Sequence, residues 1–294
     1  MRRIEVFAPA KINLTLHVTG QRDDGYHLLD SLVAFANFGD TVIVEPADDL
    51  TLEIEGHFGA SLCSESDNLV LRAARLFGAD RGAAIKLVKR LPIASGIGGG
   101  SADAAATLRA LAELWQCPIP AQSDILSLGA DVPVCMSSAL CRMQGIGDQI
   151  VPMEGWIDIG MVLVNPGIAV STPKVFANLN RRDNAPMRDV PARHEDNKDW
   201  LDWLGRQRND LEAAAIDQQP VIAEVLEELR ALPGCRLARM SGSGATCFGL
   251  FDLEQWLDTA PMRQRHPNWW IVATETLPFH FDHNIGYQVR ANSG

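Results

Sequence analysis

Four glycines fall within residues 96–100, directly before an alanine-rich stretch with helical character. Glycine loses more conformational freedom on folding than any other residue, so a plain connector gains nothing from this density. A strand, a glycine-rich turn and a helix start, in that order, gather backbone N–H groups and the positive end of a helix dipole around one point. The run therefore predicts a turn that lets an anion such as phosphate approach the backbone closely.

Two known phosphate-binding patterns fit this turn only in part. A Walker loop has lysine after its last glycine, but Ser101 stands at that place. A dinucleotide-binding loop of pattern GxGxxG would use Gly96 and Gly98, and Ser101 again replaces its third glycine. The alternative is a turn that serves helix packing only. A second loop of small residues at 240–248 (MSGSGATCF) favours two walls of one anionic site over that alternative.

The first half of the chain reads as strands and helices around the glycine turn. Residues 11–18 alternate strictly between polar and apolar, as a half-buried strand does. By the same kind of pattern, further strands are expected at 41–46, 50–56 and 83–92, and helices at 67–78, 101–115 and 123–129.

A second series of elements follows from about residue 155. Its expected strands are 157–166, 235–241, 245–251 and 269–275, and its expected helices are 209–217, 221–232 and one more before the last strand. The stretch 181–198 is polar, charged and without period, which predicts a mobile loop. Trp200, Trp203 and Leu204 recur at helical spacing, which predicts packing. We predict two domains, 1–155 and 156–294.

Charge and composition exclude several classes of protein. The net charge of −11 argues against nucleic-acid binding, which normally shows a basic footprint, but it leaves room for an anionic small molecule. The six cysteines contain no CxxC pair, which indicates reduced thiols. No apolar run approaches the roughly 20 residues of a membrane helix. We expect a cytoplasmic protein that binds no nucleic acid and no membrane; its oligomeric state stays open.

The two glycine loops and the stretch 8–16 (APAKINLTL) resemble the three sequence motifs of the GHMP kinases, a family that includes galactokinase, homoserine kinase and mevalonate kinase. The stretches 9–32, 129–134 and 171–176 are similar to a branch of that family whose substrate carries a cytidine diphosphate handle. The resemblance runs from about residue 4 to residue 251. It implies an α+β fold with an N-terminal domain like ribosomal protein S5 domain 2, a ferredoxin-like C-terminal domain and an active site in the cleft between them.

The resemblance also implies phosphoryl transfer to an alcohol with ATP and Mg²⁺. Asp131 matches the family's catalytic base, and Lys11 matches the lysine that keeps this carboxylate ionised and polarises the hydroxyl. Asn68, Leu69 and Lys89 are expected near the adenine. The loop expected to wrap the ATP phosphates consists of Pro92, Ile93, Ala94, Ser95, Gly96, Ile97, Gly98, Gly99, Gly100, Ser101 and Ala102.

The chain departs from the family pattern beside this loop. Many relatives have a second serine where Ala102 stands and a polar amide where Asp103 stands. Ser101, which is also a candidate helix cap, is therefore the expected ligand of Mg²⁺ or the β-phosphate. Asp103 is expected to point along the helix.

The acceptor substrate implied by the resemblance is a small molecule with a cytidine diphosphate group. Tyr26 and Phe176 are expected to sandwich the cytosine ring, because stacking on aromatic faces holds a base without identifying it. His27 is expected to identify the base by hydrogen bonding. Asn13 is expected to orient the substrate hydroxyl, and Thr172 also belongs to the predicted substrate site.

The site residues and the function also have other interpretations. Without the resemblance, Lys11 would be a solvated lysine on a strand, Asp131 a turn carboxylate, and Tyr26 and Phe176 core aromatics. A GHMP kinase acting on mevalonate or homoserine, and a nucleic-acid-binding module, are the rival functions. Residues 209–210 recur in relatives, but physical reasoning assigns them no role.

Overall fold

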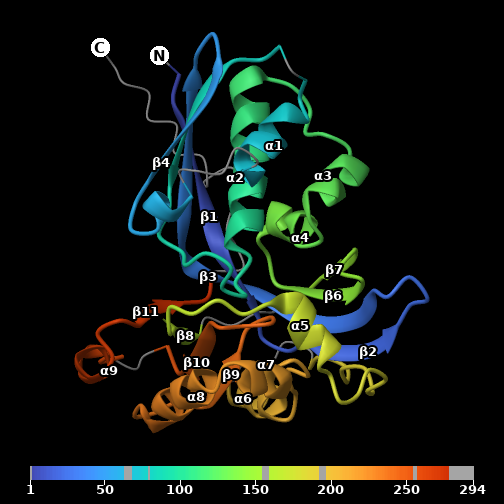
Figure 1. The fold of residues 1–294 in the computed structure, drawn as a ribbon, viewed down its shortest axis with the longest axis vertical. Coiled ribbons are helices and arrows are strands. Elements are labelled where there is room, and N and C mark those ends of the chain that lie inside the picture. Colours follow the sequence, from blue (N-terminus) through green and yellow to red (C-terminus); the bar gives the residue numbers. More distant parts are fainter. Residues whose placement is uncertain are drawn as a thin grey trace.

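The computed structural model describes residues 2–62, 68–78, 80–153, 159–191, 197–253 and 257–277. The described strands form two sheets, one of seven strands and one of four. Figure 1 shows most of the seven-stranded sheet in its upper part, with α1 to α4 beside it, and the four-stranded sheet below. The α+β class predicted from the sequence is confirmed.

The seven-stranded sheet is organised around one long strand, β3. The order is β4-β5-β3-β6-β7, and β1 and β2 also pair with β3. Every pairing is antiparallel except that of β4 with β5. The strands are β1 (Ile4–Asn13), β2 (His17–Gln21), β3 (His27–Pro46), β4 (Leu50–Glu55), β5 (Ala83–Val88), β6 (Cys141–Gly145) and β7 (Gln149–Pro152).

The helices of this half are α1 (Leu69–Arg75), α2 (Gly99–Trp115), α3 (Gln122–Leu128) and α4 (Val132–Ser137), and a short 3₁₀ turn spans Gly59–Ser61. The long helix α2 packs on β1 and β3. Its alanines at 102, 104, 105, 106 and 110 are fully or almost fully buried, so the alanine-rich run lets helix and sheet approach closely. The glycine turn is thereby fixed at the end of β5 and at the start of a buried helix.

The four-stranded sheet is antiparallel, with the order β11-β8-β10-β9. Its strands are β8 (Gly160–Asn165), β9 (Leu237–Met240), β10 (Cys247–Phe251) and β11 (Trp270–Glu275). The helices of this half are α5 (Thr172–Ala177), α6 (Asn197–Gly205), α7 (Glu212–Gln218), α8 (Val221–Ala231) and α9 (Ala260–Arg265).

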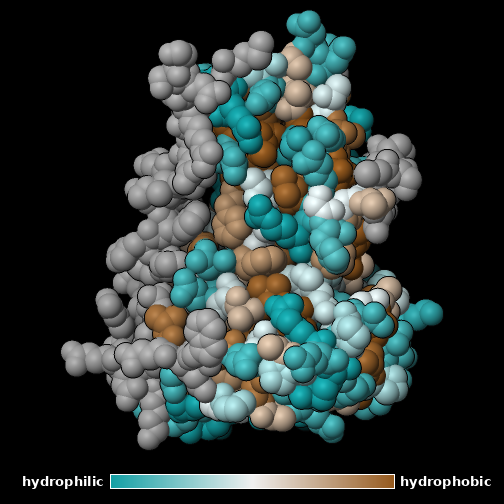
Figure 2. Space-filling view, turned by 90° about the vertical axis from the view of Figure 1, so that its left-hand side faces the viewer, coloured by the Kyte–Doolittle hydropathy of each residue, from teal (hydrophilic) through white to brown (hydrophobic). Residues whose placement is uncertain are grey.

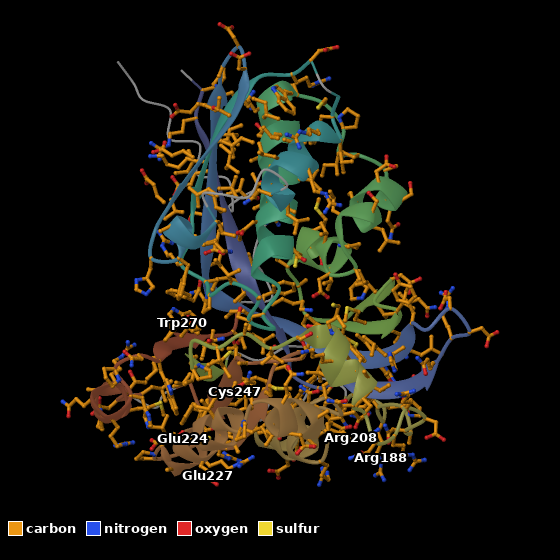
Figure 3. All side chains as sticks on the ribbon, in the orientation of Figure 1. Arg188, Arg208, Glu224, Glu227, Cys247 and Trp270 are labelled. Carbon is orange, nitrogen blue, oxygen red and sulfur yellow. The ribbon has the colours of Figure 1, made fainter. Side chains whose placement is uncertain are left out.

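One apolar cluster joins the two sheets. Ile12 and Leu14 from the first sheet share it with Trp200, Phe248 and Leu250 from the second half. Trp200, Trp203 and Leu204 of α6 are all buried in this cluster, which confirms their predicted packing role. Phe38 on β3 and Trp270 on β11, which is labelled in Figure 3, pack against the same cluster. Their ring centroids lie 5.9 Å apart. The halves are therefore held against each other by core-like contacts.

The domain boundary predicted at residue 155 lies outside the described residues and stays a prediction. The first sheet ends with β7 at Pro152, and the second begins with β8 at Gly160.

Apolar residues lie among polar ones along the side seen in Figure 2. No helix in the described part of the chain is long and apolar enough to cross a membrane.

Candidate active site

A cavity of about 1250 Å³ lies where the two halves of the chain meet. All predicted site residues line it except Ile97 and Ala102, whose side chains are buried. The glycine turn and the second glycine loop both contribute backbone to its wall, as the two-loop interpretation requires. The cavity is larger than the about 300–1,000 Å³ that is usual for a pocket holding one small ligand.

Lys11 and Asp131 meet inside this cavity. The Nζ atom of Lys11 lies 2.6 Å from Oδ2 of Asp131, and the lysine side chain is only 4% exposed whereas the aspartate is 36% exposed. Asp131 directly precedes α4, but its side chain makes no capping hydrogen bond. The interpretation of Lys11 as a solvated lysine is therefore wrong. The predicted half-buried strand 11–18 is also wrong, because β1 ends at Asn13 and β2 begins at His17. The polar side chains of this stretch are nevertheless all buried, and Lys11 and Asn13 line the cavity.

The glycines of the first loop are required by close contacts with protein. Gly96 has φ +77°, and a Cβ there would lie 2.5 Å from the carbonyl oxygen of Ser241. Gly98 has φ +62°, and a Cβ there would lie 3.0 Å from Cβ of Lys11. At both positions the positive φ disfavours other residues, and there is no room for a Cβ. The loop must therefore fit against the catalytic lysine candidate and the second glycine loop at once.

The second glycine loop is bonded to the first. The Ser241 hydroxyl donates to the Gly96 carbonyl at 3.0 Å and accepts from the Asn13 amide N–H at 3.1 Å. The amide of Thr246 donates to the carbonyl of Ser95 at 3.1 Å. Between these anchors, Gly242 takes φ +56° and lines the cavity. The two loops thus form one continuous wall.

Lys89 lines the cavity, but its charge is already engaged. Its Nζ lies 2.5 Å from Asp40 Oδ2 and 2.6 Å from Asp103 Oδ2, and the residue is 2% exposed. Burial raises the pKa of Asp103 to about 8, against the attraction of Lys89 and together with the charge of Asp40. The expectation that Asp103 points along the helix is wrong, because its carboxyl turns toward the end of β5. A contact of Lys89 with adenine stays a prediction.

Asn68, Leu69 and Ser101, the other residues expected near the nucleotide, all line the cavity, but Ser101 does not cap α2. Asn68 caps α1, since its Oδ1 accepts from the Val70 amide at 2.9 Å, and it also lines the cavity beside Leu69. Ser101 is not the cap of α2; that place belongs to Gly98, and the helix begins at Gly99. The half-buried Ser101 faces the cavity and stays the candidate for a metal or phosphate contact.

Among the described residues, no group of three or more His, Cys, Asp or Glu side chains could hold a metal ion. Mg²⁺ in nucleotide sites typically binds substrate phosphates and keeps several waters, and in P-loop proteins a serine or threonine of the phosphate loop is one of its few protein ligands. A single serine hydroxyl beside a phosphate-binding turn fits that mode. The residues present are therefore compatible with a Mg²⁺–nucleotide complex.

The far end of the cavity is aromatic. The rings of His27 and Phe176 stack with centroids 4.7 Å apart and planes 27° from parallel. Tyr26 is 62% exposed, so it is no core residue. Burial, together with the positive charge of Arg182, lowers the pKa of His27, which favours the neutral imidazole. A neutral imidazole offers one donor and one acceptor to a base.

Asn13 has the geometry of a ligand-binding amide. Its Nδ2 donates to the Ser31 hydroxyl at 2.8 Å, which fixes the orientation of the side chain. Its Oδ1 is buried at the cavity and has no hydrogen-bond partner among the described residues. A buried unpaired oxygen is costly in a folded protein, so a hydroxyl donor from a ligand would complete the arrangement.

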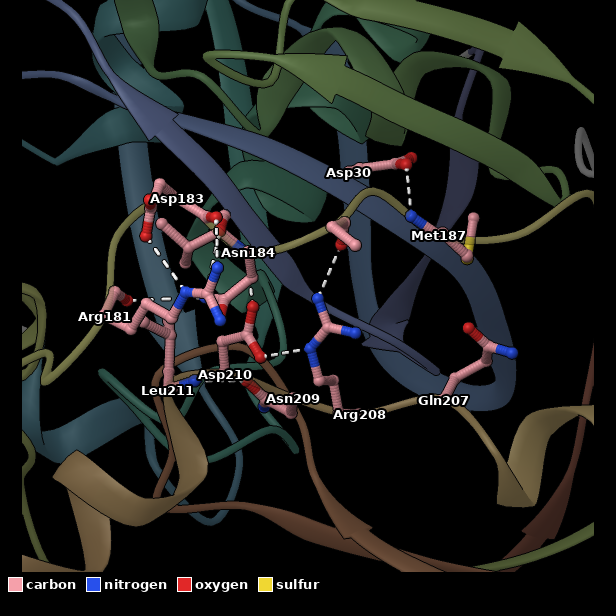
Figure 4. A network of polar contacts seen from close by, with 12 residues as sticks. Asp30, Arg181, Asp183, Asn184, Met187, Gln207, Arg208, Asn209, Asp210 and Leu211 are labelled. Carbon is pink, nitrogen blue, oxygen red and sulfur yellow. Dashed lines mark hydrogen bonds and ion pairs between the residues drawn. The ribbon is translucent and has the colours of Figure 1, made fainter.

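The first part of the polar stretch 181–198 is tied to the body of the protein (Figure 4). The amide of Met187 donates to Asp30 Oδ2 at 2.8 Å, and the amide of Asn184 donates to the Val18 carbonyl at 3.1 Å. Arg208 donates to the carbonyl of Ala185 at 2.6 Å. Residues 184–187 are therefore held by hydrogen bonds, unlike a mobile loop, and 197–198 belong to α6, while 192–196 lie outside the described residues.

Among the cavity residues missed by sequence reasoning are two arginines. Arg182 lines the aromatic end, where its guanidinium donates to the side-chain oxygen of Gln21 and the carbonyl of Ala177. Arg72 lines the opposite part of the cavity and comes from α1. Neither arginine carries a sequence signal that separates it from the arginines of an ordinary solvated surface.

Comparison with known proteins agrees with this site. The model of the GHMP kinases N terminal domain matches residues 68–155, and the model of the GHMP kinases C terminal matches residues 190–255. The chain therefore belongs to the GHMP kinases. The chain also belongs, within that class, to the family of the 4-diphosphocytidyl-2-C-methyl-D-erythritol kinases, as the following relatives establish.

The kinase of that name from Ruegeria pomeroyi is 58% identical over 93% of this chain and 99% of its own length. The one from Cereibacter sphaeroides is 56% identical over 91% of this chain and 97% of its own. A crystal structure of 4-(cytidine 5'-diphospho)-2C-methyl-D-erythritol kinase superimposes with a TM-score of 0.73 at 32% identity, covering 93% of this chain and 99% of that one. The family and the two-domain kinase fold predicted from the motifs are both confirmed.

Proposed function

We propose that the protein transfers the γ-phosphoryl group of ATP to the 2-hydroxyl of 4-diphosphocytidyl-2-C-methyl-D-erythritol, giving the 2-phosphate and ADP. The observation that carries the reaction type is the contact between Lys11 and Asp131, inside a cavity walled by two glycine loops. The named relatives support the choice of substrate. The reaction is a step in the non-mevalonate synthesis of isoprenoid precursors.

In the proposed chemistry, the substrate oxygen attacks the γ-phosphorus and the bond to the β-phosphate oxygen breaks. The hydroxyl proton passes to Asp131, whose exposed carboxylate is open to the cavity. Lys11 stays positive beside the reacting oxygen and stabilises the negative charge that develops there. Asn13 Oδ1 accepts a hydrogen bond from the substrate and orients it. Proton transfer to a positioned group typically contributes about 10²–10⁴ in rate.

The nucleotide would lie along the first loop. Backbone N–H groups and the N-terminal end of the 17-residue helix α2 favour the negative triphosphate there. Asn68 and Leu69 would border the adenine. Mg²⁺, held by the phosphates and Ser101, would supply charge neutralisation of the triphosphate when bound.

The cytidine would lie at the aromatic end of the cavity. Phe176 and Tyr26 would stack on the base, and neutral His27 would bond to its edge. Thr172 would contact the handle, because it lines the cavity together with Ser243 of the second loop, whose hydroxyl lies 2.6 Å from its own. Mevalonate and homoserine have no base, so this aromatic end disfavours kinases of those substrates.

The proposal also includes the domains of the enzyme, its location in the cell and the class of its partner. Domains 1–155 and 156–294 would form the two sides of the substrate cavity. Five free cysteines in the described part of the chain, together with the use of ATP, support a cytoplasmic location. The acidic net charge of −11 supports a small molecule as the partner in preference to nucleic acid.

A coupled assay of ADP release tests the proposed function. The purified chain is given ATP, Mg²⁺ and either the cytidylated substrate, mevalonate or homoserine. We expect ADP release with the first substrate only, and phosphorus NMR should place the new phosphate on the 2-oxygen. Turnover of mevalonate or homoserine at a comparable kcat/KM would refute the substrate, while the kinase class would stand.

A further inference from the structure

Asn209 lies in the segment between α6 and α7, next to Arg208 and Asp210 (Figure 4). Its side chain is buried, with the residue 7% exposed. The Nδ2 atom donates to the carbonyl of Met240 and to that of Gly242, both at 2.8 Å. The Oδ1 atom accepts from the amide of Leu211 at 3.0 Å. Both amide hydrogens are therefore used to hold backbone carbonyls of another segment.

The two carbonyls held by Asn209 flank the bend that opens the second glycine loop. Met240 is the last residue of β9, and Gly242 lines the cavity with φ +56°. Ser241, between them, donates to the carbonyl of Gly96 in the first loop. A Cβ on Gly242 would lie 2.8 Å from that same carbonyl oxygen. Asn209 thus fixes the second loop at its point of contact with the first.

The backbone around Asn209 is also tied to the strand that bears the acceptor site. The amide of Leu16 donates to the Arg208 carbonyl at 2.9 Å, and the Asp210 amide donates back to the Leu16 carbonyl at 2.8 Å. Oδ2 of Asp210 accepts from the Val18 amide at 2.7 Å. Leu16 follows Asn13 closely on the same stretch of chain. The segment around Asn209 therefore connects the acceptor strand with both glycine loops.

We propose that Asn209 is a positioning residue for phosphoryl transfer: by holding Met240 and Gly242 it sets the second glycine loop against the first. The proposal rests on the proposed kinase function. The relative position of the two loops fixes the distance between the γ-phosphoryl group and the acceptor oxygen. A misplacement of about 1 Å in such a geometry costs about 10²-fold in rate.

The test replaces the NH₂ group of the Asn209 side chain, a hydrogen-bond donor, by an oxygen of similar size, which is an acceptor. In Asn209→Asp, an ionised carboxylate faces two carbonyl oxygens and repels them. We expect kcat to fall by about tenfold to a hundredfold. The KM for ATP should change less than threefold, because the first loop keeps its own anchor, the hydrogen bond from the Lys11 amide to the Ile97 carbonyl.

A pH profile separates positioning from general destabilisation. When the new carboxyl is protonated it again donates one hydrogen bond, so the kcat of Asn209→Asp relative to wild type should rise as the pH falls. The ratio is used because both proteins share the charged neighbours Arg208, Asp210 and Glu212, the last of which accepts from the Met240 amide at 2.9 Å. The deficit of Asn209→Ala should not depend on pH, since alanine carries no proton.

Asn184 provides the matched control. Its Nδ2 also donates to two carbonyls, those of Val18 at 3.2 Å and Arg181 at 3.4 Å, but the residue does not line the cavity. We expect Asn184→Asp to keep kcat within twofold of wild type. Equal losses in both Asp variants, or a folded Asn209→Ala with wild-type kcat, would overturn the proposal.

Hydrogen exchange gives a second readout that needs no turnover. The amides of 241–246 should exchange faster in Asn209→Ala than in wild type, and in Asn184→Ala they should not. Unchanged exchange in Asn209→Ala would overturn the proposal, even if the Asp variant failed to fold. Absence of ADP release from the wild type would instead refute the proposed function and leave the exchange result to be judged by itself.

Discussion

The Nζ atom of Lys11 lies 2.6 Å from Oδ2 of Asp131, although one residue belongs to the first strand and the other precedes α4. Helix α2 brings them together, because it packs on β1 along one side and on α4 along another. The pair stands in the cavity wall, with the ammonium buried and the carboxylate reachable. An anion-binding turn, a carboxylate and an ammonium thus converge on one place.

Asp131→Asn should remove catalysis without unfolding the protein. The amide keeps the shape of the carboxyl but no longer takes up a proton, so we expect kcat to fall by about 10²–10⁴. Lys11→Met should lower kcat too, because the developing charge on the acceptor oxygen loses its partner. Steady-state kinetics with circular dichroism checks both variants, and a folded Asp131→Asn with near-normal kcat would remove the assignment.

Gly96→Ala should damage the junction of the two glycine loops. The new Cβ would lie 2.5 Å from the Ser241 carbonyl oxygen and 2.8 Å from that of Gly244, in a backbone with φ +77°. Backbone neighbours cannot swing away, so we expect a stability loss of about 1–3 kcal/mol. The kcat/KM for ATP should fall by at least about tenfold, because the phosphate-binding backbone moves.

Gly78→Ala separates conformational strain from close approach. Gly78 has φ +109°, but in the described part of the chain no neighbouring atom lies within 4 Å of the place that a Cβ would take, and the residue does not line the cavity. The variant should lose about 1–2 kcal/mol of stability and keep its kcat/KM for ATP. Kinetic damage of the same size in both variants would show that strain alone accounts for the effect of Gly96→Ala.

Lys89→Met should act on stability more than on nucleotide binding. The lysine pairs with Asp40 and also contacts Asp103, in a site where all three side chains are at most 4% exposed. Breaking a buried ion pair by removing one partner costs about 3–5 kcal/mol. Urea unfolding measures the loss. A raised KM for ATP with unchanged stability would instead support the predicted adenine contact.

Lys86→Met, on β5 just before Lys89, is the matched control. Lys86 lies 2.9 Å from Glu55 and 3.6 Å from Glu53, but all three side chains are substantially exposed. Exposed ion pairs contribute little because water screens them. The unfolding midpoint of this variant should stay close to that of wild type.

His17 should make the protein sensitive to mild acid. Burial, with the charge of Arg208, lowers the pKa of this histidine below its ordinary value of 6.5. Below pH 6.5 His17 therefore binds a proton more readily in the unfolded chain than in the folded chain, so the free energy of unfolding falls as the pH falls. Urea unfolding between about pH 7.5 and about pH 5 should show wild type losing stability relative to His17→Gln. A constant difference between the two would contradict this reasoning.

The sequence predicted the elements whose patterns are local. The turn before α2 and the strand β4 carry their own glycine or alternation signals, and the structure has both. The long strand β3 was recognised only at its end, 41–46. Residues 32–36 are all buried in it, so the strand is covered on both faces and shows no alternation.

The site could be predicted only through motifs, since its contacts join distant segments. No pattern in the sequence predicts that Asp40 and Asp103 contact Lys89, because the residues are far apart along the chain and none of them belongs to a recognisable motif. Gly96 illustrates the same limit. Its sequence context predicts a phosphate turn, whereas the space above its Cα is taken by the carbonyl of Ser241. Such neighbours become visible only when the two halves are packed together.

Competition among nucleotides should reveal how the aromatic end identifies its base. Against the non-ATP substrate, CMP should inhibit more strongly than UMP or AMP. Stacking on Phe176 holds any base, whereas hydrogen bonds to His27 depend on the base edge. His27→Phe should keep the stacking surface and bring the inhibition constants of CMP and UMP together. Phe176→Ala should weaken both nucleotides alike, because stacking on a base is worth about 1–3 kcal/mol whatever its edge. If wild type binds all three nucleotides equally, the aromatic end does not read cytosine.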